Sequence, residues 1–212
     1  MNNFYLEKVS KIKENMPETD GDPCLELKEM LEIGTGTDAE FTLKPVSPNE
    51  VLKTDKKMKK TTSMGRDDIP ADLFFIALPL MLPAVTHIIN LSLREAKFPE
   101  IWKISKISPL FKGGDSRHDP KQYRPVALLP ICARLLEKIV CDQVMDYLYK
   151  KDLLHSHNHG YRKFHGTITA LIEAQEEAMD AMERGEIMGM VTLDQSSAFD
   201  VIEHDILKSK LI

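Results

Sequence analysis

The segment that most constrains the fold is the short apolar run Ile187–Leu193, which ends at the carboxylate of Asp194. A run of this length and composition predicts a β-strand. An aspartate at the end of an apolar strand must be hydrogen-bonded, exposed or bound to a metal ion. A capping role for Asp194 and a core position for Phe199 explain the pattern as well as a metal site does. A two-metal site needs carboxylates from a further strand, whereas twelve residues follow Asp200. The segment therefore predicts half of an active site.

Composition is that of an ordinary globular chain. Apolar residues make up 42% of the 212 residues and charged residues 29%, which suffices for one domain with an appended segment. The longest apolar run is shorter than 18 residues, so we expect no membrane-spanning segment, and the N-terminus lacks the pattern of a signal peptide. Three cysteines without paired metal-ligand spacing predict reduced thiols. We expect an intracellular protein, in the nucleus or the cytoplasm.

The net charge of −5 conceals an uneven distribution. The first fifty residues carry eleven acidic and five basic side chains, which leaves twenty-two acidic and twenty-three basic ones for the remainder. Within that remainder, Lys53–Arg66 holds six basic residues against one acidic residue, Asp55. Local positive potential is what a phosphate backbone senses. The cluster is therefore either a nucleic-acid contact or a solvated helix face.

Helical periodicity alternates with few strand-like runs. Glycines and prolines between Glu14 and Pro48 predict a loosely packed arm with a possible short helix near Leu25–Ile33. Ser47-Pro48-Asn49-Glu50 is typical of a capped helix start. The expected helices are 48–60, 69–80, 84–96, 130–150, 166–183 and one that begins near 203, and the expected hairpin pairs 107–111 with 123–128. This order predicts an α+β fold with too few strands for a complete sheet.

Two apolar faces are expected to pack into the core. In 69–96 and in 166–183, apolar residues recur at helical spacing. The expected buried positions are Leu73, Ile76, Leu80, Val85, Ile88, Ile89 and Leu93 in the first stretch, and Ile168, Leu171, Ile172, Gln175, Met179 and Met182 in the second.

The predicted hairpin carries two basic residues near its loop. Lys112 follows the first strand beside two glycines, and Arg124 begins the second strand. A lysine and an arginine that converge from one hairpin suit a triphosphate, because lysine supplies a point charge and arginine a bidentate donor. Two solvated basic side chains would give the same pattern.

Six short motifs occur in a fixed order over about residues 47–212. They are Gly65-Arg66-Asp67-Asp68-Ile69-Pro70, Phe98-Pro99-Glu100-Ile101-Trp102-Lys103, Pro109-Leu110-Phe111-Lys112-Gly113-Gly114-Asp115, Tyr123-Arg124-Pro125-Val126, Gly160-Tyr161-Arg162, and Leu193-Asp194 through Ala198-Phe199-Asp200. Together they resemble the reverse transcriptases of non-LTR retrotransposons, jockey-type elements in particular. Residues 1–46 would then be a partly helical connector, and 47–212 a partial reverse transcriptase domain.

The resemblance implies a partial right-hand polymerase fold. Helical fingers with a β-hairpin and the first palm strand would be present, whereas the thumb and the rest of the palm would be absent. The implied activity is RNA-directed DNA synthesis with an RNA template, a DNA primer and dNTPs. In this family the residue at the position of Asp194 ligates the catalytic Mg²⁺ ions, which stabilise in-line displacement.

The resemblance also implies roles for the other motif residues. Lys112 and Arg124 would hold the triphosphate, and Phe199 would lie under the sugar and exclude a 2′-hydroxyl. Arg162 would contact the template backbone, and Asp200 would support local structure. Asn158 and Gly166 stand where the family usually carries Gln and Ser, in the loop expected near the template.

Catalysis by the chain alone is uncertain, because it ends before the family's Tyr-x-Asp-Asp hairpin. We expect a polymerase fragment that is inactive alone. The alternative is a domesticated nucleic-acid-binding module without catalysis, and no oligomeric state is predicted.

The loop between the last two long helices is rich in histidine. His155, His157, His159 and His165 could bind zinc, but the sequence offers no Cys or acidic partner at a usual spacing. We therefore expect an ordinary loop.

Overall fold

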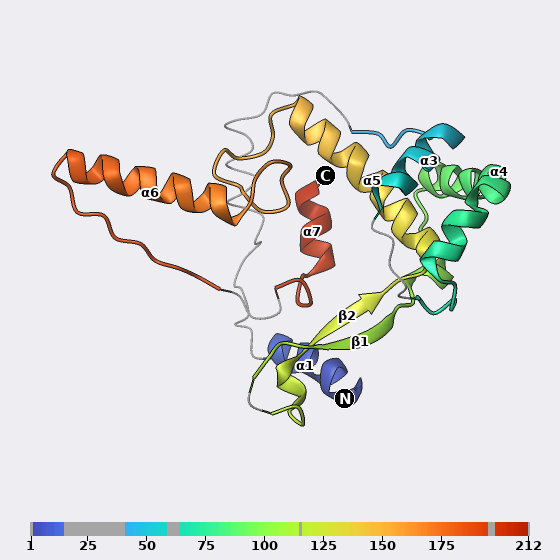
Figure 1. Ribbon diagram of the computed structural model, residues 1–212, viewed down its shortest axis with the longest axis horizontal. Helices are drawn as coiled ribbons and strands as arrows, with labels where there is room; N and C mark the ends of the chain where they lie inside the picture. The colour runs from blue at the N-terminus through green and yellow to red at the C-terminus, as the bar shows by residue number, and fades with distance from the viewer. Residues whose placement is uncertain (1, 15–40, 59–63, 115, 195–197, 212) are drawn as a thin grey trace. The chain divides into compact units, whose positions relative to one another are not determined.

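The computed structural model describes residues 2–14, 41–58, 64–114, 116–194 and 198–211. The chain divides into two compact units, one of residues Met1–Asp146 with Glu203–Ile212 (unit 1) and one of residues Tyr147–Ile202 (unit 2). Figure 1 shows the elements of both, and each unit is treated by itself. The short helix predicted near Leu25–Ile33 lies outside the described residues.

Helices dominate both units. Unit 1 contains α1 (Asn2–Glu14), α3 (Pro48–Lys57), α4 (Ala71–Glu95), the 3-10 turn η1 (Glu100–Lys103), β1 (Lys106–Phe111), the 3-10 turn η2 (Pro120–Gln122), β2 (Tyr123–Leu128), most of α5 (Ile131–Lys150) and α7 (His204–Leu211). Unit 2 contains the end of α5 and α6 (Thr167–Glu183). The described strands form one two-stranded antiparallel sheet. An α+β mixture with few strands is therefore confirmed at this level.

The predicted capping box starts α3. The Ser47 hydroxyl accepts a hydrogen bond from the Glu50 backbone N–H at 3.3 Å, and the Glu50 carboxylate accepts one from the Ser47 backbone N–H at 2.7 Å. These two bonds satisfy backbone donors that a helix start leaves unpaired. The Ser47 backbone N–H and then the Ser47 hydroxyl, each donating to the Glu50 carboxylate at 2.7 Å, lower the pKa of Glu50, because these bonds favour its charged form. The helix ends at Lys57, three residues earlier than expected.

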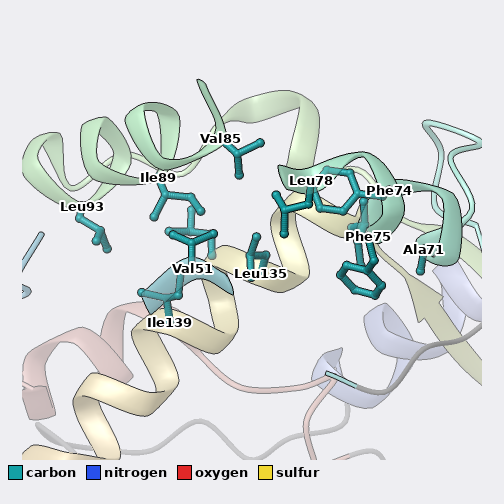
Figure 2. Packing of buried hydrophobic residues seen from close by; sticks show 12 residues of the cluster. Val51, Ala71, Phe74, Phe75, Leu78, Val85, Ile89, Leu93, Leu135 and Ile139 are labelled. Carbon is teal, nitrogen blue, oxygen red and sulfur yellow. The ribbon is translucent and has the colours of Figure 1, made fainter. Parts of the chain in front are cut away.

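The two helices expected between residues 69 and 96 are one helix. α4 runs from Ala71 to Glu95 with Pro79 and Pro83 inside it. Each proline removes one backbone hydrogen bond and disturbs the preceding turn, and Figure 2 shows the helix changing direction between Leu78 and Val85. The prediction of a break at Pro83 was wrong. Apolar contacts on both sides of the prolines hold the two halves in one helix.

The core of unit 1 lies between α3, α4 and α5 (Figure 2). Its buried members are Val51 from α3, Ala71, Phe74, Phe75, Leu78, Val85, Ile89 and Leu93 from α4, and Ile131, Leu135, Leu136 and Ile139 from α5. Phe98 and Trp102 pack against this cluster from the η1 segment. Burial of apolar surface is the main favourable term in folding. These three helices therefore form the stable centre of the unit.

The prediction of which α4 residues are buried is confirmed for most of the second half of the helix and is wrong for the first half. Val85, Ile89 and Leu93 are buried as predicted, whereas Ile88 is 42% exposed. In the first half Leu73, Ile76 and Leu80 are 57%, 76% and 88% exposed, and Phe74, Phe75 and Leu78 are buried instead. Every residue from 73 to 78 is apolar. Periodicity therefore gives no preference for either face.

By length and composition, α4 could also cross a membrane; it alone of the described helices passes this test. Its phenylalanines and Leu78 nevertheless pack against α3 and α5 in unit 1. One face of α4 therefore lies in the core of unit 1, and 28% of its apolar window is buried.

The hairpin follows the prediction closely. β1 and β2 pair antiparallel, with Lys106 opposite Leu128, Leu110 opposite Arg124 and Phe111 opposite Tyr123. Most of its side chains are exposed. An isolated two-stranded hairpin is marginally stable in water, so its position depends on attachments at the base. These are the packed Trp102 before β1 and the buried Ile131 after β2.

Unit 2 differs from the expectation in its apolar surface. α6 forms as predicted, but the stripe expected to be buried is exposed: Ile168 is 73%, Leu171 69% and Met182 74% exposed. Only Ala181 is buried in this helix. The periodicity correctly predicts an apolar face, but it does not establish that another element covers it.

The predicted strand Ile187–Leu193 is not a strand. The segment has no regular secondary structure, and Ile187, Val191 and Leu193 are 101%, 84% and 91% exposed. A strand forms only with a hydrogen-bonded neighbour, and β1 and β2 pair with each other alone among the described residues. The β-type composition is present without a partner strand.

Gly65 fixes the loop before α4 against the exit of the hairpin. It is buried, and a Cβ on it would lie 2.6 Å from the Pro130 nitrogen and 2.7 Å from the Leu129 carbonyl carbon. Both neighbours are backbone atoms, which cannot rotate away. The first motif therefore contains a glycine because the main chains approach closely.

We predict that Gly65→Ala lowers the free energy of unfolding of unit 1 by about 1–3 kcal/mol through overpacking. Urea denaturation followed by the fluorescence of Trp102, the sole tryptophan, measures this change. Gly189→Ala is the matched control, since nothing lies within 4 Å of a Cβ there. Equal stability of the two variants would contradict the close approach.

Candidate functional site

The hairpin places its basic residues on one face. Side chains alternate along a strand, so the observed register puts Lys106 and Leu110 of β1 on the same face as Arg124 of β2. The Lys112 backbone N–H donates to the Gln122 carbonyl at 2.8 Å, which continues the register by one pair. Lys112 and Arg124 are then diagonal neighbours, typically about 7–8 Å apart. The predicted convergence of these two residues fits the backbone geometry.

The opposite face of the hairpin is aromatic. The rings of Phe111 and Tyr123 have centroids 5.3 Å apart, and the Arg117 guanidinium lies 5.6 Å from the Phe111 centroid. The Tyr123 hydroxyl donates to the Arg117 carbonyl at 2.9 Å. These contacts organise the loop end of the hairpin and leave the basic face free of bulky rings.

Lys112, Arg124 and Lys106 are all exposed. The Lys112 ammonium donates to the Lys121 carbonyl at 3.1 Å, and the Lys106 ammonium lies 3.7 Å from Asp68. Arg124 makes no ion pair with the described residues. Lys106 was not identified from the sequence as part of this surface, although the alternation of side chains along β1 places it on the same face as Lys112. This surface, called the basic face, comprises Lys106, Lys112 and Arg124.

Two glycines give the basic face an open rim. Gly113 and Gly114 have φ of +85° and +146°, a region that favours glycine. A Cβ on Gly114 would lie 2.4 Å from the Gln122 side-chain oxygen, whereas one on Gly113 would meet nothing within 4 Å. The backbone beside Lys112 is therefore accessible to a ligand.

The cluster Lys53–Arg66 is only partly described. On α3, Lys53, Lys56 and Lys57 are exposed, and Lys57 lies 3.7 Å from Asp142. Lys59 and Lys60 lie outside the described residues. A solvated helix face and a nucleic-acid contact both fit this arrangement.

Asp194 stands in unit 2 and does not form a metal site there. It is exposed at the end of the irregular segment. Among the described residues, Asp194 does not belong to a group of three side chains that could hold a metal ion. Asp200 is likewise exposed, in a turn. One exposed carboxylate does not supply the oxygen ligands that Mg²⁺ needs, so the implied magnesium site does not fit these residues alone.

Phe199 contacts a residue of another motif. Its ring packs edge-on against Tyr161 with centroids 6.0 Å apart, and both rings are exposed, by 74% and 90%. Tyr161 also has a φ of +56°, which costs conformational energy in a residue other than glycine. Phe199 is therefore not the core ring that was the simpler interpretation.

Arg162 holds its own loop together. Its Nη1 donates to the His155 carbonyl at 3.0 Å, and the guanidinium lies 5.9 Å from the centroid of the Tyr149 ring. The Tyr149 hydroxyl in turn accepts from the Lys163 backbone N–H at 2.8 Å. These contacts give Arg162 a structural role, and a template contact remains a prediction.

The histidine loop meets acidic residues of α6, which spacing along the chain did not suggest. His157 and His159 each contact one oxygen of the Glu173 carboxylate. Hydrogen bonding from His159, and then from His157, lowers the pKa of Glu173. Glu173 and Glu177 are four residues apart on α6 and so share a face. That pair of glutamates on one helix face was the feature of the sequence that could have indicated an acidic partner for the histidines.

Comparison with known proteins confirms the predicted resemblance. The chain is 28% identical over 170 residues to the probable RNA-directed DNA polymerase from transposon BS of Drosophila melanogaster, and 27% identical over 173 residues to that from transposon X-element. It is 28% identical over 160 residues to the RNA-directed DNA polymerase from mobile element jockey of Drosophila funebris. These matches cover 80%, 81% and 76% of the chain.

The chain spans about a fifth of the length of these relatives, since the matches cover 19%, 19% and 18% of them. No protein-family model matches the sequence.

We predict that Arg162→Ala loosens the loop 155–165. Loss of a charged hydrogen bond should lower the local opening free energy by roughly 1–2 kcal/mol, measured by amide hydrogen exchange. Lys163→Ala is the control, since the Lys163 side chain contacts the exposed Phe164 ring, whose centroid lies 4.8 Å from the ammonium. Unchanged exchange in Arg162→Ala would show that Arg162 does not order this loop.

Proposed function

We propose that residues 47–212 are part of a reverse transcriptase domain of a non-LTR retrotransposon and act in RNA-templated DNA synthesis. The observation that carries this proposal is the similarity over about four fifths of the chain to retrotransposon RNA-directed DNA polymerases. The six ordered motifs support it. Residues 1–46 would connect this part to a preceding domain, and the protein would act inside the cell.

The basic face is the proposed triphosphate and nucleic-acid contact. Lys112 and Arg124 lie on the same side of an exposed hairpin, beside two glycines that leave the backbone accessible. A lysine ammonium and an arginine guanidinium match the charge and the oxygen geometry of phosphates. Lys106 extends the positive surface along β1.

In unit 2, Asp194 is the proposed catalytic metal ligand and Phe199 the proposed sugar contact. Their exposure leaves both side chains available to a ligand or to further parts of a polymerase domain. Arg162 is a proposed template contact in addition to its role in the loop. Divalent metal use follows from the family, and Mg²⁺ is the proposed ion because carboxylate oxygens are its preferred ligands.

A second candidate function is nucleic-acid binding without catalysis. It is favoured by the combination of a basic face with an Asp194 that belongs to no group of three possible metal ligands among the described residues. Both candidates require nucleic-acid binding, and only the first requires extension of a primer by a polymerase domain that contains these residues.

We predict that Lys112→Glu/Arg124→Glu weakens binding to an RNA–DNA hybrid. Fluorescence anisotropy at several salt concentrations should show a shallower dependence of log K on log salt, by about one unit for each phosphate that the variant no longer binds. Arg94→Glu/Lys97→Glu is the matched control with the same change in charge at exposed positions near the end of α4. Binding equal in both variants would rule out the basic face, and no wild-type binding at low salt would rule out both functions.

We predict that the polypeptide of residues 1–212 does not extend a primed RNA template with Mg²⁺ and dNTPs. Asp194 belongs to no group of three possible metal ligands among the described residues, and phosphoryl transfer depends on metal ions that several ligands hold in place. Gel analysis of a labelled primer measures the product. Extension that Asp194→Asn abolishes would contradict the prediction and show a complete site.

A further inference from the structure

A mixed histidine–carboxylate cluster lies in unit 2, where none of the proposed polymerase residues takes part. One ligand atom from each of His157, Glu173 and Glu177 lies within 4.8 Å of the others. His157 comes from the loop after α5, and the two glutamates come from successive turns of α6. The three side chains thus approach one point from two different segments.

Glu173 is already oriented by the loop. Its Oε1 contacts His157 Nδ1 and its Oε2 contacts His159 Nε2. His159 Nδ1 lies 2.8 Å from the Thr169 hydroxyl, one turn before Glu173 on α6. That hydroxyl also donates to the Gly166 carbonyl at 2.9 Å, so both ring nitrogens of His159 have a side-chain partner on α6. This arrangement resembles the hydrogen bonds that orient ligands around protein-bound metals.

We propose that His157, Glu173 and Glu177 bind a divalent transition-metal ion of the zinc type, with His159 as a positioning residue. Imidazole nitrogen and carboxylate oxygen are both zinc ligands, at about 2.0–2.2 Å from the ion. Two ligand atoms of one tetrahedral ion then lie about 3.3–3.6 Å apart. Glu177 is exposed and Glu173 half-buried, so side-chain rotation can close the remaining gap without movement of α6.

The chemistry separates this ion from the one implied at Asp194. Mg²⁺ prefers oxygen ligands and near-octahedral geometry, whereas an imidazole ligand favours zinc and its neighbours in the transition series. A ring nitrogen in the cluster therefore selects against magnesium. The site ties the loop 155–165 to α6 whether or not the domain polymerises DNA.

Isothermal titration calorimetry with ZnCl₂, on the chain after EDTA treatment and dialysis, tests the site. We expect one equivalent to bind, no comparable heat from MgCl₂, and affinity at least about tenfold lower in His157→Ala and Glu177→Gln. His118→Ala is the control, because it removes an exposed histidine that lies outside the loop and the three ligands. Cobalt titration should give no thiolate charge-transfer band. Binding by the cysteines, equal affinity in all variants or no binding by the wild type would overturn the proposal.

A measurement on the unaltered chain covers the case in which a variant does not fold. Diethyl pyrocarbonate modifies accessible imidazoles, and mass spectrometry assigns the modified residue. We expect ZnCl₂ to reduce modification of His157 strongly and to leave the exposed His118 unchanged. Equal modification of His157 with and without zinc would contradict the site.

Discussion

The packing of α4 against α5 and Val51 is the interaction on which the rest of unit 1 depends. The hairpin buries little surface of its own, and a two-stranded sheet of this size is marginally stable alone. Its first strand begins just after Trp102, which packs against the core, and its second strand leads into the buried Ile131. The close backbone approach of Gly65 to Leu129 and Pro130 adds a third attachment. The helical core thereby fixes the orientation of the basic face.

Unit 2 has much less buried surface. The apolar stripe of α6 and the segment Ile187–Leu193 are both exposed among the described residues. Contiguous exposed apolar surface is typical of regions that contact another protein element. Within the unit, polar contacts therefore contribute more to holding the loop 155–165 in place. Arg162 donates to the His155 carbonyl, and the Glu173 carboxylate contacts two histidines. The proposed zinc ion would strengthen these contacts.

Local signals in the sequence predicted local structure well. Ser47 and Glu50 predicted the start of α3, and the turn-rich segment between two β-type runs predicted the hairpin. Pro83 did not end its helix, because tertiary contacts outweighed a local penalty. The exposed faces of α4 and α6 and the missing strand share one cause: burial depends on a partner element, and an apolar pattern in one segment contains no information on that partner. The contact between His157 and Glu173 could not be predicted for the same reason. It joins a loop residue to a helix residue sixteen positions further along the chain.

In the proposed reverse transcriptase domain, the hairpin presents a phosphate-binding surface. Hydrogen–deuterium exchange of the chain with and without an RNA–DNA hybrid at low salt tests this surface most directly. We expect slower exchange on hybrid binding in residues 106–128, with the core helix α4 unchanged. Protection that is absent from the hairpin and confined to other segments would contradict it.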